Sequence, residues 1–246
     1  MTATTVVLRT EARLFAREPG ALFWIVAFPA LLLTALGLVP AFREVDEELD
    51  GLRVVDLYVP IAVLLAMIMA GVQSMPVVLS GYRERGILRR LSATPARPSS
   101  LLAAQLAVHG GAVLVAVALT LAVGWLAFDV EPAGQPVGYG LAVLLAAFTS
   151  LALGGMIAAL TPSAKAAQTL GLVIFFPAMF SAGVYVPVST MPGLLGDVVE
   201  LTPFGASAAA LDRAAAGNWP HGLDVAVTGV WGLLFLGVAA RWFRWE

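Results

Sequence analysis

The chain gathers much of its positive charge into one stretch, residues 82–98, which lies between two long uncharged stretches. Its five arginines could bind anionic lipid headgroups. Ile87, Leu88 and Leu91 share one helical face and could instead enter a groove on a soluble partner. The spacing predicts a short amphipathic helix over residues 83–91, which the prolines that follow would end. The stretch is therefore a candidate docking segment, and the alternative is a positive loop that only sets membrane topology.

Other residue patterns that could do chemistry are absent from the sequence. There is no cysteine, and the only lysine, Lys165, follows an alanine rather than the glycine of a phosphate-binding loop. No zinc-protease or serine-hydrolase motif occurs. We therefore expect no catalytic residue, no metal site and no cofactor bound by this chain. For the isolated His109 we expect a hydrogen bond between helices, and the alternative is a metal or proton-relay role.

The composition is that of an integral membrane protein. Apolar residues make up 60% and charged residues 12%, whereas soluble domains carry about 25% charged residues. A spanning helix needs about 20 apolar residues, and a charge at its centre is costly, so charges mark the ends of spans. The uncharged windows predict six transmembrane helices in an all-α fold, at residues 22–39, 57–80, 101–128, 139–160, 168–186 and 225–240.

The basic residues predict the orientation of these spans. Eleven of the fourteen fall on one side of the predicted membrane, and most of the sixteen acids fall on the other. The positive side faces the cytoplasm, so the chain is expected to be a multi-pass plasma membrane protein with both termini cytoplasmic. Because Lys165 is the single lysine among these basic residues, we expect a GC-rich bacterial source.

Two segments outside the spans also have a pattern. Residues 1–19 place apolar side chains on one helical face and arginines on the other, which predicts an interfacial helix lying on the inner leaflet. Residues 187–222 carry charges at intervals too short for a span, together with four prolines, which predicts a re-entrant helical hairpin on the outer face. The whole chain, residues 1–246, is then a single transmembrane domain that includes the segment 82–98.

Two spans carry candidate pathway residues. Methionine adapts to differently shaped ligands, and an amide within the membrane needs a partner. The second span supplies Met69 and Gln73, and the fifth span contains the densest aromatic run of the chain. Packing between helices is the alternative role for all of these side chains. The candidates for the pathway are Met69, Gln73, Phe176, Met179, Phe180 and Ser181.

Three segments in order carry a family resemblance. The run from Glu84 to Pro95, Glu-Arg-Gly-x-Leu-x-x-Leu-x-x-Thr-Pro, resembles the cytoplasmic coupling segment of ABC-2 type ABC transporter permeases. Phe180-Ser181-x-Gly183-x-x-x-Pro187, with the Met-Pro, Thr-Pro and Leu-Asp-Arg motifs that follow, resembles the fifth helix and outer hairpin of the same family. The helix of residues 1–19 is similar to its amino-terminal elbow helix.

The resemblance implies a transport subunit that is not itself an ATPase. Two copies of a separate ABC ATPase would hold the ATP and Mg²⁺, and a second permease copy, identical or a close paralogue, would complete the transporter. Nucleic acid is not an expected partner. The residues implied to dock onto the ATPase are Glu84, Arg85, Gly86, Ile87, Leu88, Leu91, Thr94 and Pro95.

The resemblance also implies an inner-membrane exporter of hydrophobic or amphiphilic substrates, such as daunorubicin and other drugs, lipids or glycan precursors. A sodium-extruding ABC permease is one alternative. The other is an ion-coupled secondary transporter, which would be expected to place carboxylates or broken helices near the membrane midplane.

Overall fold

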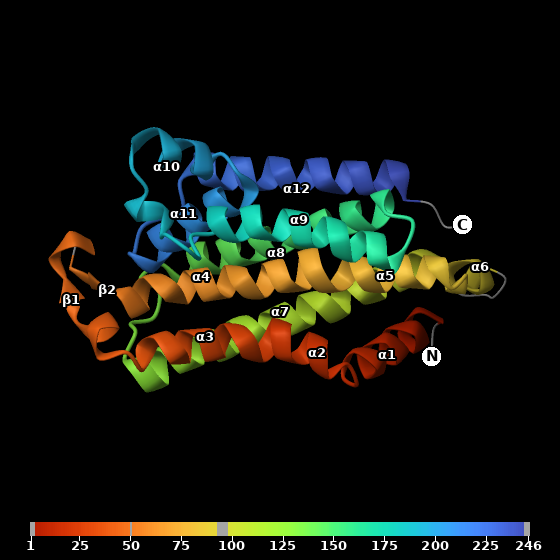
Figure 1. Ribbon diagram of the computed structural model, residues 1–246, viewed down its shortest axis with the longest axis horizontal. Coiled ribbons are helices and arrows are strands. Elements are labelled where there is room, and N and C mark those ends of the chain that lie inside the picture. Colours follow the sequence, from red (N-terminus) through yellow and green to blue (C-terminus); the bar gives the residue numbers. More distant parts are fainter. Residues whose placement is uncertain (1–2, 50, 93–97, 244–246) are drawn as a thin grey trace.

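The computed structural model describes residues 3–49, 51–92 and 98–243, and within them six helical spans run side by side along the long axis of the molecule (Figure 1). This confirms the predicted all-helical membrane fold. The first span joins α2 (Pro19–Ala21), η1 (Leu22–Ala27) and α3 (Phe28–Gly37), and the second joins α4 (Val54–Ile68), η4 (Met69–Ser74) and α5 (Met75–Glu84). The others are α7 (Pro98–Phe128), α8 (Pro136–Leu160), α9 (Ala164–Ser181) and α12 (Gly222–Trp242).

The second span forms the centre of the bundle. In its most apolar window 78% of the residues are buried inside the protein, against 22% in α9 and 28% in α12. A helix that is apolar all round suits such a position, because every face meets another helix. The remaining spans present apolar side chains to the outside, as a membrane protein must toward lipid.

Two spans contain a wider, π-helical turn next to a proline. In the second span η4 precedes Pro76, which has no backbone N–H to donate to the preceding turn. Ser150 of α8 donates its hydroxyl to the carbonyl oxygen of Met67 at 2.6 Å, just before η4 begins. The Ser150 hydroxyl thus finds its acceptor on the backbone of the neighbouring span, and the bond joins α8 to the central span.

Glycines let α8 pack directly against the backbone of η4. A Cβ added at Gly154 would overlap the carbonyl oxygen of Gly71, and one added at Gly71 would overlap the backbone of Ser150. Small residues at such positions allow close helix approach in membranes. The pair Gly71 and Gly154 therefore sets the separation between the central span and α8.

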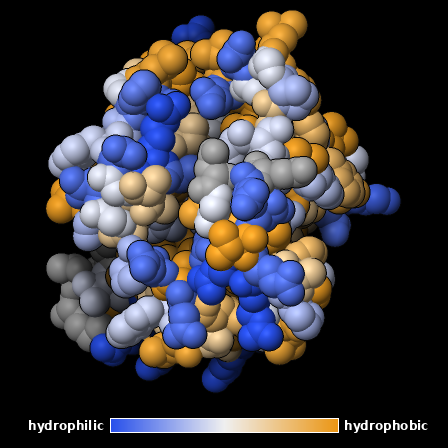
Figure 2. All heavy atoms as spheres, turned by 90° about the vertical axis from the view of Figure 1, so that its left-hand side faces the viewer, coloured by the Kyte–Doolittle hydropathy of each residue, from blue (hydrophilic) through white to orange (hydrophobic). Residues whose placement is uncertain are grey.

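One end of the bundle carries the short elements between the first two spans. They are η2 (Pro40–Arg43), β1 (Val45–Asp46), η3 (Glu47–Leu49) and β2 (Leu52–Arg53), with Val45 opposite Arg53 in the antiparallel pair. Figure 2 looks onto this end, where polar and charged side chains are mixed with apolar ones. Such a mixture is expected for an end that leaves the membrane and meets water.

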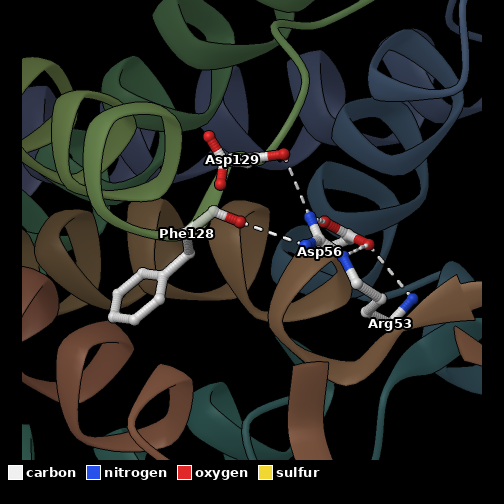
Figure 3. A network of polar contacts seen from close by, with 4 residues as sticks. All are labelled: Arg53, Asp56, Phe128 and Asp129. Carbon is white, nitrogen blue, oxygen red and sulfur yellow. Dashed lines mark hydrogen bonds and ion pairs between the residues drawn. The ribbon is translucent and has the colours of Figure 1, made fainter. Parts of the chain in front are cut away.

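Arg53 ties the second span to the end of α7 (Figure 3). Its guanidinium donates to both carboxylate oxygens of Asp56, at 2.9 and 2.7 Å, and to the carbonyl oxygens of Phe128 and Asp129, at 3.1 and 3.2 Å. Asp129 has a positive φ of 51°, which ends α7 in the left-handed conformation. A cation at the carboxyl end of a helix is favourable because it complements the helix dipole.

At the same end lies a bent helix pair, in the segment for which the sequence predicts the outer hairpin. This segment contains η5 (Val188–Thr190), α10 (Gly193–Glu200) and α11 (Pro203–Ala215), and α10 and α11 are bent by 99° relative to each other. Its last helix, α11, is largely buried against the bundle. Arg213 of α11 forms an ion pair with Asp224 at the start of α12, with Nε and Oδ2 at 3.1 Å.

The opposite end of the bundle holds the two amphipathic segments. There α1 (Ala3–Phe15) packs against α7, and α6 (Ile87–Ser92) packs against α5 and α7. The carboxyl end of α12 lies at the same end (Figure 1). With six spans, the chain crosses the membrane an even number of times, so α1 and the carboxyl end of α12 must lie on the same side.

Candidate functional site

The docking segment is a turn followed by a short helix, not one continuous helix. The sequence predicts a helix over residues 83–91, but α5 continues only to Glu84 and α6 starts at Ile87. Between them Gly86 has a φ of +66°, a conformation that residues with a side chain rarely adopt. Gly86 therefore ends the helical run of α5, and α6 begins as a separate helix.

The structure separates the aliphatic residues that were predicted to share a docking face. Ile87 is half-buried, whereas Leu88 is only 1% exposed and is enclosed by its own chain. Leu88 is thus not available to a partner in this conformation, because its position faces the spans on which α6 packs. The side chain of Leu91 lies outside the described residues, as do Thr94 and Pro95.

The exposed residues of the segment are charged. Glu84, Arg85 and Arg90 all face solvent, and Arg85 and Arg90 also bond to nearby backbone carbonyls, at 3.1 and 3.0 Å. Glu84 accepts a hydrogen bond from the backbone N–H of Ala164, the first residue of α9, at 3.0 Å. A carboxylate is favourable at the start of a helix, where backbone N–H groups are unpaired. The segment is thereby connected directly to the fifth span.

One arginine of the segment is structural instead. Arg83 donates to the carbonyl oxygens of Ala158 and Thr161, at 2.7 and 2.9 Å, and so caps the end of α8. Its guanidinium also lies 5.1 Å from the centre of the Phe243 ring. Because the guanidinium satisfies carbonyls that the helix leaves unpaired, Arg83 joins α5, α8 and the end of α12.

A buried carboxylate connects α1 to this region, and the sequence did not reveal its partners. Glu11 is 7% exposed, and its Oε2 accepts hydrogen bonds from Tyr82 Oη at 2.8 Å and Gln105 Nε2 at 2.6 Å. Burial raises the pKa of Glu11, although the two hydrogen bonds oppose this rise. The sequence did indicate that Glu11 lies on the apolar face of an amphipathic helix, and a carboxylate in that position needs a polar partner on another element.

His109 lies beside this group and makes the expected contact between helices. Its Nε2 lies 3.1 Å from Ser74 Oγ in η4, and its Nδ1 lies 3.0 Å from the carbonyl oxygen of Gln105. The ring of Phe15 packs edge-on against the imidazole. Both imidazole nitrogens therefore have partners on spans, and the group joins α1, α7 and the central span.

We expect Glu11→Ala to destabilise the protein by about 2 to 5 kcal/mol, because the buried donors of Tyr82 and Gln105 would each lose their acceptor. Glu11→Gln is the matched control: both donors bond to the same oxygen, which the amide oxygen can replace.

Since the folded-state pKa of Glu11 lies above its ordinary value of 4.5, ionising Glu11 costs the folded state more than the unfolded state. The stability of Glu11→Gln relative to the wild type should therefore rise as the pH increases above 4.5. Thermal unfolding in detergent over a pH series measures both effects, and equal stability of the alanine variant would contradict the prediction.

The candidate pathway residues do not form one surface within this chain. Met69 is 8% exposed and packs in the core, and Ser181 is buried and donates to the carbonyl oxygen of Ala178 in its own helix. For these two, packing explains the observed environment. Gln73 is partly exposed, and its Nε2 is buried without a hydrogen-bond partner among the described residues.

The remaining candidates lie on α9, which presents an open apolar face. Phe176 is 55% exposed and Phe180 36% exposed, one helical turn apart, and Leu172 extends the same face. Met179 is half-buried, and its sulfur lies 3.9 Å from Tyr185 Oη. Phe176 and Phe180 thus point away from the bundle, toward lipid or another protein, whereas Phe175 packs against the core.

A family model described as ABC-2 type transporter matches residues 2–211. The chain belongs to the ABC-2 type transporter family. No curated protein sequence matches the chain. The matched range includes α1, the docking segment, α9 and most of the outer hairpin. As an ABC-2 permease, the chain is the membrane-spanning subunit of an ABC transporter and is not itself an ATPase, and permeases of this family normally work with an ABC ATPase.

Proposed function

We propose that this permease couples ATP hydrolysis on a separate ATPase to the export of an apolar or amphiphilic substrate. Two ATPase copies would hold the ATP and Mg²⁺ and would contact α6. The observation that carries the proposal is the hydrogen bond from the Ala164 N–H to Glu84. The bond connects Glu84, the last residue of α5, to the start of α9, the helix that carries the open aromatic face. A movement of the docking segment is therefore passed on to α9.

The positive charge supports a cytoplasmic position for the end that carries α6. Arg85 and Arg90 are exposed there, and α1 and the carboxyl end of α12 lie at the same end. Basic residues collect on the cytoplasmic side of plasma membrane proteins. The proposed orientation therefore places both termini in the cytoplasm and the outer hairpin outside.

The open face of α9 supports pairing with a second permease copy. Phe176 and Phe180 are exposed on this face, one helical turn apart, and Leu172 extends it. Two such faces around a shared path would form an apolar wall suited to drugs or lipids. The carboxylates of the spans lie near the span ends, as at Asp56 and Asp224, which favours an amphiphile over sodium as the substrate.

Isolation of the tagged permease from its native membranes tests the proposal. We expect a nucleotide-binding polypeptide to co-purify in equal amount, and we expect amphiphiles to stimulate its ATP hydrolysis after reconstitution into liposomes. Purification without an ATPase, or hydrolysis that no amphiphile changes, would contradict the proposed coupling.

In the same liposomes, Phe176→Ala combined with Phe180→Ala should change the rank order of the amphiphiles that stimulate hydrolysis. The change is expected because the two rings supply much of the exposed area of the α9 face. Phe148→Ala is the matched control, since Phe148 on α8 is 37% exposed, close to the 36% of Phe180. An unchanged rank order in the double variant would return both rings to a packing role.

A further inference from the structure

A second apolar surface, which no residue of α9 lines, lies at the ends of α4, α7 and α8 that are proposed to face outward. It is a cleft of about 470 Å³, within the range of about 300 to 1,000 Å³ that is typical of ligand pockets. Its lining is almost entirely apolar and includes Val59, Pro60, Val117, Leu121, Trp125 and Val143. No part of the proposed coupling or of the α9 face contributes to it.

The cleft opens sideways between α7 and α8. Leu121, Trp125 and Gly140 line it and are exposed, so they form its mouth, whereas Val117 and Val143 are buried and form its floor. The two helices diverge here because they pack on different neighbours: α7 lies against α1, α3 and α4, and α8 lies against α12, η4 and α11. A mouth between two spans faces the hydrocarbon of the membrane.

The water-facing rim of the cleft is acidic. Asp56 and Glu131 both line it. Arg53 lies 2.7 Å from Asp56 and also interacts electrostatically with Asp129 and Glu131, so one positive charge is shared among three acids. Glu131 is exposed and forms no ion pair within the part of the chain that the structure describes, and the neighbouring Asp129 adds a second negative charge. The rim therefore carries net negative charge directly beside an apolar cleft.

We propose that this cleft binds a cationic amphiphile from the outer leaflet, with its apolar chain against Trp125 and Val143 and its ammonium group beside Glu131. The lateral mouth admits a chain directly from lipid, and the acidic rim selects a positive headgroup over a neutral or negative one. The site is separate from the proposed path along α9 and does not depend on the transport function.

Gly140 provides a way to fill the cleft without disturbing the fold. A Cβ at this position meets no atom within 4 Å and Gly140 lines the mouth, so Gly140→Leu adds bulk at the mouth without a clash at Cβ. Gly237 on α12 is the matched control, because a Cβ there also meets nothing and Gly237 does not line the cleft. For the charge, Glu131→Gln is compared with Glu47→Gln, which removes another exposed acid from the same end of the protein.

The probe is dodecylamine with a photoreactive diazirine in its chain, applied to the purified permease in lipid nanodiscs. We expect mass spectrometry to find adducts on α7 and α8 at the cleft, and unlabelled dodecylamine to compete far better than dodecanol or dodecanoate. Gly140→Leu should reduce the labelling at least tenfold, and Glu131→Gln should weaken competition about two- to fivefold. Gly237→Leu and Glu47→Gln should change neither value.

Undiminished labelling of Gly140→Leu would overturn the site. Competition by dodecanoate as strong as that by dodecylamine would overturn the proposed selectivity for a cation. Both outcomes are independent of the ATPase, so a failure of this proposal and a failure of the proposed export function give different results.

Discussion

Replacing Leu88 by serine is expected to release the ATPase from the permease, with an affinity loss of about thirtyfold or more. Leu88 is 1% exposed, on a helix that packs against α5 and α7. Truncating a buried leucine costs about 2 to 5 kcal/mol, and each 1.4 kcal/mol corresponds to a factor of ten. A helix of six residues has few other contacts to retain its position, so the docking surface itself would be lost.

The neighbouring residue provides the comparison. Ile87 is half-buried, so Ile87→Ser removes part of a contact surface without detaching α6, and we expect an affinity loss of about five- to tenfold. Arg90→Gln removes an exposed charge and should have a smaller effect, because exposed ion pairs contribute about 0 to 1 kcal/mol. Affinities are measured by titrating the ATPase onto immobilised permease, and size-exclusion chromatography confirms that each variant is intact. If both serine variants bind like the wild type, α6 is not the docking element.

Replacing Gly154 by alanine is expected to lower the melting temperature by about 6 to 12 °C. The added methyl group would overlap the carbonyl oxygen of Gly71, and it would also meet the side chain of Met75 at 2.9 Å. Overpacking of side chains costs about 1 to 3 kcal/mol. Since the obstacle at Gly154 is backbone, we expect about 3 kcal/mol, and in a chain of this size each kcal/mol shifts the melting temperature by about 2 to 4 °C.

The adjacent glycine is the matched control for this substitution. A Cβ at Gly155 meets only the Cβ of Ala239, at an ordinary distance of 3.6 Å. Alanine is preferred over glycine within helices by about 1 kcal/mol, so Gly155→Ala should leave the melting temperature unchanged or raise it slightly. Thermal unfolding followed by tryptophan fluorescence in detergent measures both variants. Equal melting temperatures for the two would show that α8 and the central span do not meet backbone to backbone.

The spans and the outer hairpin could be predicted from the sequence because charges and prolines mark where a helix can stay in lipid. The sequence did not indicate which of the six spans lies at the centre of the bundle. All six windows are apolar, and only tertiary packing decides that Met69 lies in the core while Phe176 faces outward. A single apolar pattern is compatible with a lipid-facing helix and with a buried one.

In the docking segment too, local spacing predicts the helix but does not predict which side chains are buried. The helical period grouped Ile87 with Leu88 on one docking face, but the structure leaves Ile87 half-buried and encloses Leu88 after the turn at Gly86. The hydrogen bonds from Tyr82 and Gln105 to Glu11 join residues 71 and 94 positions apart. Contacts at such separations depend on how the helices are arranged, and local spacing carries no information about that.

The length of the central span has a consequence for where the ATPase meets the permease. Its 31 residues extend over about 46 Å at 1.5 Å per residue, whereas the hydrocarbon core is about 30 Å thick. Arg53 and Asp56 fix one end of the span at the boundary with water. The surplus of about 15 Å therefore reaches into the headgroup layer at the other end, where Glu84 bonds the first residue of α9 and Tyr82 bonds Glu11 of α1. An ATPase bound to α6 would therefore sit close against the headgroups and would meet the ends of the central span, α1 and α9 together.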